Sequence, residues 1–481
     1  MKNSGLGAIL VLCVVSATTG LAQTFGEVSF DGSDGNYPGV MALAQNFDGT
    51  LFGTTGQGGA YNQGTVFKID RKHELTTVYS FCANANCMDG SAPAGGLVLG
   101  SDGNLYGTTY SGGTGPCNDA SVGCGTVFKL TPQGTLITLH SFQGPDGSHP
   151  RATLILAIDG NLYGDTSDGG PFGNHGTIFR VTSTGDVATV YNFCAQGGIC
   201  TDGSNPYSPL VQGLDGQLYG TTDGGGTAGA GTIFQLTLSG KLATLHSFDG
   251  RDGGGQQSGL TAAADATFYG TSTNGGYQGY GTIYHFTPPG AVNVIYTFNG
   301  DAIAPSGGLI QATDGNFYGI TSGGSLSQPS PLYPLSPVVY GTIFSISPGG
   351  TLTTLHMFNY RNGGGFQSLG GLLQDTDGAF YGTTLKGGAY DDGTVFGLSM
   401  GLGPFVAFLR GAAKVNQQFG ILGQGLTGAT GVSLNGTPAS FTVTSGTFIV
   451  ATVPVGATTG NVTVTTPTGT LTSNVPFHVI P

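Results

Sequence analysis

Apolar and polar residues alternate in short runs along most of the chain, and the runs are grouped in a recurring unit. Each unit holds an aromatic residue followed by Gly-Thr-Thr or a variant, and then Gly-Thr-Val/Ile-Phe/Tyr. Alternation of this kind is typical of β-strands with one buried face. Because glycine-rich turns separate the runs, we predict an all-β chain of short strands joined by tight turns.

The unit recurs seven times, at intervals of about 50–60 residues. Its first aromatic residue is, in successive copies, Phe52, Tyr106, Tyr163, Tyr219, Tyr269, Tyr318 and Tyr381. In copy six the alternation predicts four strands, over residues 309–312, 316–321, 341–347 and 351–358. Four-stranded units at this period are typical of propeller blades, which bury both faces only by stacking around an axis. We therefore predict a seven-bladed β-propeller of four-stranded blades.

The seventh copy lacks a fourth strand of its own, because Arg410 stands where other copies carry a phenylalanine. Residues 27–32 instead resemble the fourth strand found at 246–250. We predict that residues near Phe25 to Phe30 complete the last blade, which closes the ring and removes its open edges.

Loop length distinguishes two rims of this ring. The turns between first and second strands, and between third and fourth strands, have constant length and share one side, the fixed rim. The loops from second to third strands, and from each fourth strand to the next copy, vary in length and share the opposite side, the variable rim. Since variable loops on a rigid scaffold commonly carry binding sites, we expect a ligand site on the variable rim.

Tyrosines and aspartates are the candidate binding residues of the variable rim. The tyrosines are Tyr61, Tyr277, Tyr280, Tyr333, Tyr340 and Tyr390. The aspartates, from recurring Asp-Gly turns, are Asp34, Asp89, Asp146, Asp202 and Asp252. Tyrosine rings stack on apolar sugar faces and polar groups bind hydroxyls, so this set favours sugar recognition. The alternative is that glycine-rich loops simply tolerate tyrosine.

Familiar catalytic motifs are missing from the sequence. It contains no Gly-x-Ser-x-Gly elbow, no His-Glu-x-x-His motif and no phosphate-binding loop with its lysine. The aspartates that recur before glycine are predicted to form turns; they are Asp48, Asp102, Asp159, Asp215, Asp314 and Asp377. We expect no cofactor and no metal, with calcium binding by variable-rim turns such as 31–36 as the alternative.

Histidine occurs at one repeat position in exchange with tyrosine. His140, His246 and His356 occupy the position that Tyr79, Tyr191 and Tyr296 fill in other copies. This exchange favours a packing role over metal or substrate binding. His149 and His175 are not fixed by the repeat and stay open as functional residues.

Charge and cysteine content restrict the partners and the compartment. The formal net charge is −13 with only 13 lysines and arginines, which argues against nucleic acid and anionic membranes. Residues 1–22 are predicted to be a secretory signal, with a lipid anchor at Cys13 as the alternative. The other cysteines form the close pairs Cys82 with Cys87, Cys117 with Cys124, and Cys194 with Cys200, for which export favours disulfides over zinc. We expect a monomer, extracellular or on the cell surface, without membrane insertion of the mature chain.

The pattern changes near residue 401, where threonine and valine alternate, as in 460–466. These short runs predict a C-terminal β-sandwich over 401–481, after a signal peptide at 1–22 and a propeller at 23–400. The runs 420–426, 432–439 and 453–457 resemble the IPT/TIG immunoglobulin-like family, which implies an Ig-like spacer or interaction module. The repeats, with Leu-Tyr-Gly-Thr-Thr at 105–109 and Gly-Thr-Val-Phe at 125–128, resemble the GloVer tandem-repeat proteins over 38–398. That resemblance implies a bacterial exported protein and carries over no site residue.

These patterns favour a non-catalytic binding or adhesion protein whose variable rim meets a polysaccharide or an extracellular protein. Two alternatives stay open: a glycan-active hydrolase or lyase that uses rim carboxylates, and a purely structural surface protein. A pair of rim carboxylates facing each other across a cleft would favour the enzyme, and an aromatic rim would favour binding.

Overall fold

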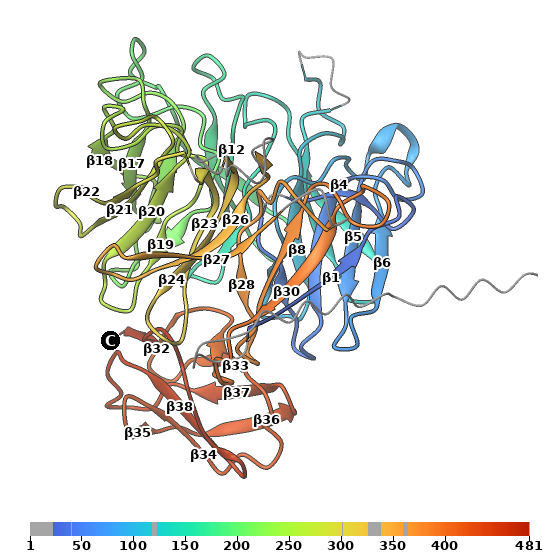
Figure 1. Cartoon of the computed structure of the whole chain (residues 1–481), viewed down its shortest axis with the longest axis vertical. Coiled ribbons are helices and arrows are strands. Elements are labelled where there is room, and N and C mark those ends of the chain that lie inside the picture. The colour runs from blue at the N-terminus through green and yellow to red at the C-terminus, as the bar shows by residue number, and fades with distance from the viewer. Residues whose placement is uncertain are drawn as a thin grey trace, which may run out of the picture.

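The computed structural model describes residues 23–39, 41–117, 123–300, 302–325, 338–358 and 364–480. Within these ranges the regular structure is β-strand apart from one 3-10 turn, Ala85–Cys87, so the all-β prediction is confirmed (Figure 1). The predicted signal peptide, residues 1–22, lies outside the described residues. Over the part of the chain described, no helix is long and apolar enough to span a membrane.

The chain up to Ser399 forms antiparallel sheets, each named here after the repeat copy that it contains. Sheet one contains β2 (Asn36–Pro38), β3 (Ala44–Gln45), β4 (Leu51–Gln57), β5 (Thr65–Ile69) and β6 (Leu75–Ser80). Sheet two contains β7 (Val98–Leu99), β8 (Leu105–Thr109), β9 (Thr126–Leu130) and β10 (Leu136–Ser141). Sheet three contains β11 (Ile155–Leu156), β12 (Leu162–Thr166), β13 (Thr177–Val181) and β14 (Val187–Asn192), and sheet four contains β15 (Val211–Gln212), β16 (Leu218–Thr222), β17 (Thr232–Leu236) and β18 (Leu242–Ser247).

The later copies form sheets of the same design. Sheet five contains β19 (Thr261–Ala262), β20 (Phe268–Ser272), β21 (Thr282–Phe286) and β22 (Asn293–Thr297). Sheet six contains β23 (Ile303–Gln311), β24 (Phe317–Ser325), β25 (Val338–Val339), β26 (Thr342–Ile346) and β27 (Leu352–Met357). Sheet seven contains β28 (Leu373–Gln374), β29 (Phe380–Thr384) and β30 (Thr394–Ser399), together with β1 (Thr24–Ser29).

The repeated residues build the contacts inside each sheet. In sheet two, a Cβ on Gly107 would lie 2.6 Å from the ring of Phe128 and 2.9 Å from Leu97, so only glycine lets these side chains pack across the second strand. The hydroxyls of Thr109 and Thr126 lie 2.8 Å apart between the second and third strands. The same glycine and hydroxyl pair recur in the other sheets, which explains why the motif is repeated.

Each sheet packs on the next through its own apolar cluster. Phe52 and Phe81 of sheet one meet Leu105 and Phe128 of sheet two, and equivalent clusters join each later pair. Another cluster joins the last sheet to the first, and its members include Phe30, Val395, Leu51 and Phe67. The first strands of several neighbouring sheets contact one another, whereas fourth strands are half-exposed, so the sheets form a closed ring compatible with a β-propeller.

The N-terminal strand completes the sheet of the last copy, as predicted. β1 pairs with β30 antiparallel, from Thr24 opposite Ser399 to Ser29 opposite Thr394. Phe30, which follows β1, is fully buried, and its ring centre lies 5.0 Å from that of Phe67 in sheet one. The ring is therefore closed by a strand from the opposite end of the chain.

The C-terminal residues form further sheets around one core. The first four-stranded sheet contains β31 (Ala407–Phe408), β33 (Gln418–Leu422), β37 (Phe448–Thr452) and β36 (Phe441–Ser445). The second contains β35 (Thr437–Pro438), β34 (Gly431–Leu434), β38 (Val462–Thr466) and β39 (Gly469–Thr472). A parallel pair is formed by β32 (Ala412–Lys414) and β40 (His478–Ile480). Both four-stranded sheets contribute to one apolar cluster, so they pack face to face.

This C-terminal sheet pair contacts the fixed rim of the ring (Figure 1, red, below the sheets). The ring of Phe448 stacks on that of Phe47 at 4.1 Å, in the turn between β3 and β4. Gln424 Nε2 donates a 2.8 Å hydrogen bond to Thr376 Oγ1, and Asn474 Nδ2 donates one to Gln311 O. All three partners lie in or beside turns between first and second strands, so the contacts leave the variable rim on the other side.

Candidate functional site on the variable rim

The two kinds of variable loop lie side by side, which confirms that they share one rim. Ser91, in the loop that leads into sheet two, forms a bridge with Ser111, in the loop after its second strand. The same bridge joins Ser148 to Asp168 and Ser204 to Gly224 in the next two sheets. This rim is thus a continuous surface made by loops from different sheets.

Four of the six predicted tyrosines are exposed on these loops. Tyr277 is 96% exposed, and Tyr61, Tyr280 and Tyr390 also expose two fifths or more of their surface. Tyr340 is instead half-buried, with its ring centre 5.0 Å from that of Phe366, which indicates a packing role. Tyr333 lies outside the described residues.

A more compact cluster lies where the loops meet the inner strands, and the sequence analysis did not find it. The guanidinium of Arg151 lies over the ring of Tyr110 at 4.4 Å and over that of Tyr207 at 4.9 Å. Tyr110 follows β8, Arg151 precedes β11 and Tyr207 precedes β15, so three sheets contribute. Arg151 Nε is buried without a hydrogen-bond partner.

Carboxylates and a histidine surround this arginine. The ring of His149 stacks on Tyr110 at 4.4 Å, and His149 Nδ1 lies 3.3 Å from Asp168 Oδ2. Burial opposes ionisation of Asp168, but hydrogen bonds from His149 and Ser167 and the nearby charge of Arg151 hold its pKa below the usual value. Burial raises the pKa of Asp223, against a hydrogen bond from the Gln257 side chain. We call Tyr110, His149, Arg151, Asp168, Tyr207 and Asp223 the arginine cluster.

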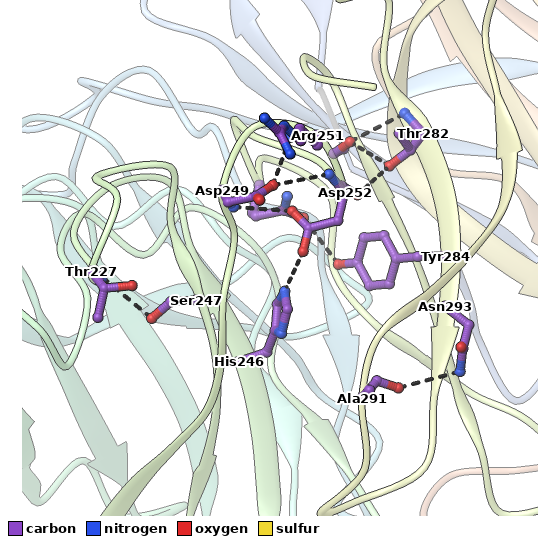
Figure 2. A network of polar contacts seen from close by, with 12 residues as sticks. Thr227, His246, Ser247, Asp249, Arg251, Asp252, Thr282, Tyr284, Ala291 and Asn293 are labelled. Atoms are coloured by element: carbon purple, nitrogen blue, oxygen red, sulfur yellow. Dashed lines mark hydrogen bonds and ion pairs between the residues drawn. The ribbon is translucent and has the colours of Figure 1, made fainter. Parts of the chain in front are cut away.

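The predicted rim aspartates, by contrast, hold their own loops. His246 Nε2 lies 2.6 Å from Asp252 Oδ2, and the Asp249 N–H donates to the other oxygen of the same carboxylate (Figure 2). Asp146 is held by His140, Asp89 by Tyr79, and Asp202 by Tyr191, each at 2.8 Å. In these four sheets the exchange of histidine and tyrosine is therefore explained, because either ring reaches the loop carboxylate. His356 instead stacks on Phe25, with the ring centres 3.9 Å apart.

Because either ring serves, we expect His140→Tyr to keep the free energy of unfolding, whereas His140→Ala lowers it by about 1–3 kcal/mol, since Asp146 Oδ2 loses its hydrogen-bond partner. Chemical denaturation of the two variants measures the difference. A tyrosine variant as unstable as the alanine variant would contradict this role.

Asp34 differs from the other rim aspartates because Val28 stands at the histidine/tyrosine position of its sheet. Burial raises the pKa of Asp34 to about 6, although its carboxylate accepts the N–H of Asp31. Asp31 in turn accepts hydrogen bonds from the N–H and hydroxyl of Ser33. These carboxylates thus serve the turn itself, and calcium binding at 31–36 stays a prediction.

The cysteines form the three predicted disulfides, Cys82–Cys87, Cys117–Cys124 and Cys194–Cys200. Such bonds are consistent with an extracellular protein. Among the described residues, His175 and the sulfurs of Cys194 and Cys200 form a group with potential ligand atoms within 4.8 Å of one another. Disulfide sulfurs carry no thiolate, so this group has no metal-binding thiolates in its oxidised form.

Two carboxylates that break the repeat were also missed. Asp165, on β12, stands where five other copies carry threonine, and Asp375 stands where five others carry glycine or alanine. Both are buried and have oxygens without hydrogen-bond partners. Comparing the copies position by position, rather than searching for motifs, would have found them.

The fold and these loops define an all-β repeat protein made of four-stranded antiparallel sheets. The chain belongs to the Gloeobacter/Verrucomicrobia repeat family, whose model matches residues 11–119 and 117–333. This confirms the predicted resemblance of the repeats as far as residue 333. No curated protein matches the chain in sequence.

Solved structures with a similar arrangement include a polysaccharide lyase, at 10% identity and a TM-score of 0.44 over 77% of this chain and 91% of that one. An auxiliary nutrient binding protein from Bacteroides ovatus has 11% identity and a TM-score of 0.38 over 76% and 70% of the two chains. A protein of unknown function from Bacteroides thetaiotaomicron has 13% identity and a TM-score of 0.40 over 79% and 76%. Likeness at this level says nothing about the activity of this chain.

Proposed function

We propose that this protein is a secreted or cell-surface, non-catalytic glycan-binding protein that presents the variable rim of a seven-bladed β-propeller. The propeller comprises residues 23–400, after a signal peptide at 1–22. The C-terminal residues 401–481 form an IPT/TIG-like spacer that contacts the opposite rim. The ligand is a polysaccharide outside the cell, and the protein acts as a monomer.

The arginine cluster is the observation that carries this proposal. It combines two tyrosine rings with a guanidinium whose Nε has no hydrogen-bond partner, and with two carboxylates. Rings and charged groups that converge from three sheets are typical of sites that stack on a sugar and bind its hydroxyls. The exposed tyrosines of the variable rim, such as Tyr277, offer further rings to a longer chain.

The glycan-active enzyme remains the second candidate, now with a specific observation in its favour. His149 and Asp168 lie beside Arg151, so an imidazole ring, a carboxylate and a guanidinium share one place on the rim. Four other rim carboxylates are poorer candidates for glycan cleavage, because each already accepts hydrogen bonds from a histidine or tyrosine ring and from a backbone N–H. They are Asp89, Asp146, Asp202 and Asp252.

A binding screen of residues 23–481 against soluble polysaccharides tests the proposal. For a polysaccharide that binds, we expect Arg151→Ala and Tyr207→Ala to weaken binding about tenfold or more, as for central residues of an interface. Tyr277→Ala should have a smaller effect because it lies outside the cluster. Calorimetry measures each dissociation constant.

Arg251→Ala is the matched control, since Arg251 lies on the same rim but outside the arginine cluster. We expect it to change affinity less than twofold. Absence of binding to any polysaccharide, or equal effects of the two arginine variants, would contradict the proposal. New reducing ends or unsaturated products in the same mixtures would favour the enzyme.

A further inference from the structure

A cavity lies at the seam where the ring of sheets closes, between sheet seven and sheet one on the fixed rim. Its volume is about 150 Å³. An adjoining hollow of about 210 Å³ shares Ile69, His73 and Tyr381 with it and is bordered by Phe25, Val28 and Val395. Together the two spaces reach the lower end of the volumes of about 300–1,000 Å³ that are typical of small-molecule sites.

Asp375 gives this seam cavity an unused hydrogen-bonding group. Asp375 is 3% exposed, and its Oδ1 atom has no hydrogen-bond partner. Its Oδ2 atom lies 3.8 Å from a terminal guanidinium nitrogen of Arg71. Burial and the charge of Asp377 raise the pKa of Asp375 to about 7, against the effect of Arg71. Since five other sheets have Gly or Ala at this position, the fold itself does not require the carboxyl group.

Gly397 leaves the ring of Tyr381 uncovered. In sheet two the equivalent residue, Lys129, places its Nζ atom 5.6 Å above the ring of Tyr106. In sheet four Gln235 donates a 2.8 Å hydrogen bond to the hydroxyl of Tyr219. A Cβ on Gly397 would lie 3.1 Å from the Tyr381 ring, so any side chain there would stand against the ring that both hollows share.

The turn between β5 and β6 departs from the repeat at the same place. His73 has a φ of 63°, a left-handed conformation, where four other sheets have a glycine with positive φ. Such a backbone is unfavourable for residues with a side chain. His73 nevertheless lines both hollows, and the guanidinium of Arg71 lies over Gly49 beside the cavity. Three residues that differ from their counterparts in other sheets thus meet at the two adjoining hollows: Asp375 lines the seam cavity, Gly397 lines the second hollow, and His73 lines both.

We propose that the seam cavity binds a single sugar unit that carries an apolar substituent. The apolar face of the sugar stacks on Tyr381, one hydroxyl donates to the Asp375 carboxylate, and Arg71 donates to a second oxygen of the sugar. The substituent occupies the hollow beside Phe25 and Val28. This site is separate from the variable rim, and it stands whether or not the rim binds polysaccharide.

The test uses residues 23–481 and a panel of methyl and 4-nitrophenyl glycosides, with binding measured by ligand-observed NMR and calorimetry. We expect saturable binding of at least one glycoside, with the nitrophenyl form about tenfold tighter than the methyl form of the same sugar. Asp375→Ala and Gly397→Gln should each weaken binding at least tenfold. Both changes install residues that other sheets carry, so we expect melting temperatures no lower than that of the parent.

Ser345→Gln is the matched control, because it makes the same kind of change on β26 of sheet six, away from the seam. Arg151→Ala separates this site from the variable rim, and neither variant should alter glycoside binding. The proposal is overturned if no glycoside binds, if Gly397→Gln binds as the parent does, or if Asp375→Ala only lowers the melting temperature. The last result would assign Asp375 to a structural ion pair with Arg71.

Discussion

Deletion of residues 23–32 should lower the melting temperature by about 10 °C or more, because it opens the ring. The deletion removes β1, and with it the pairing from Thr24 to Ser29 along β30. It also removes Phe30 from the cluster that joins the last sheet to the first. Each buried phenylalanine contributes about 1.5–3 kcal/mol, and Phe25 and Val28 add to this loss. Calorimetry of the shortened chain beside residues 23–481 measures the change.

A peptide covering residues 23–32, added in excess, should restore part of the lost stability because it can pair with the open β30 edge. A scrambled peptide of the same composition is the control. An unchanged melting temperature after deletion would mean that β1 adds little to ring closure. Equal rescue by both peptides would show a non-specific effect.

Replacement of Asp165 by threonine should stabilise the protein, and more so as the pH rises. Both oxygens of Asp165 are buried without hydrogen-bond partners, and burial raises its pKa to about 8. Unfolding returns the carboxyl to a pKa of about 4, so above that pH the unfolded chain releases a proton that the folded chain keeps. The native protein therefore loses stability from about pH 4 to about pH 8. At about 1.4 kcal/mol per pKa unit, this loss reaches at most about 4 kcal/mol at pH 7.

Threonine is the residue of five other copies at this position, and Thr54 there donates a 3.0 Å hydrogen bond to Gly95 O of the next sheet. Asp165→Thr should thus remove the pH-dependent loss without leaving a cavity. Denaturant unfolding of parent and variant at pH 4, 6 and 8 measures the difference. Thr108→Ser, at the same position of sheet two, is the control and should leave the pH dependence of the parent unchanged. Parallel pH profiles of parent and Asp165→Thr would show that the carboxyl is ionised and partnered in the fold.

The repeat and its closure could be predicted because they depend on local rules. The glycine of Leu-Tyr-Gly-Thr-Thr is needed wherever a third-strand phenylalanine packs across it, and each Asp-Gly turn uses the same backbone hydrogen bond. The similarity of residues 27–32 to other fourth strands identified the partner of β30 from the amino-acid sequence alone. Close cysteine spacing similarly limited each disulfide to a local loop.

The candidate sites could not be predicted in this way, because their members are distant in sequence. Arg151 meets Tyr110 and Tyr207 only after sheets two, three and four pack side by side. Tyr61 and Tyr277 were found by their position on long loops, whereas Tyr340 occupies a similar loop and packs on Phe366. Exposure of a loop residue depends on its neighbours from other sheets, which alternation along one strand does not encode.

The sequence by itself thus determined the strand pattern, the repeat, the closing strand and the disulfides, since each follows from spacing and local chemistry. The tertiary structure decided which loop carboxylates are bonded to a histidine or tyrosine ring, and which aromatic rings have no side chain packed over them. It also decided where residues that break the repeat come together. Asp375, His73 and Gly397 each differ from the equivalent residues of other sheets, but they come together at adjoining hollows only because the last sheet packs against the first. The physical reason is that ring closure brings the two ends of the repeat array into contact, and only the folded chain contains that contact.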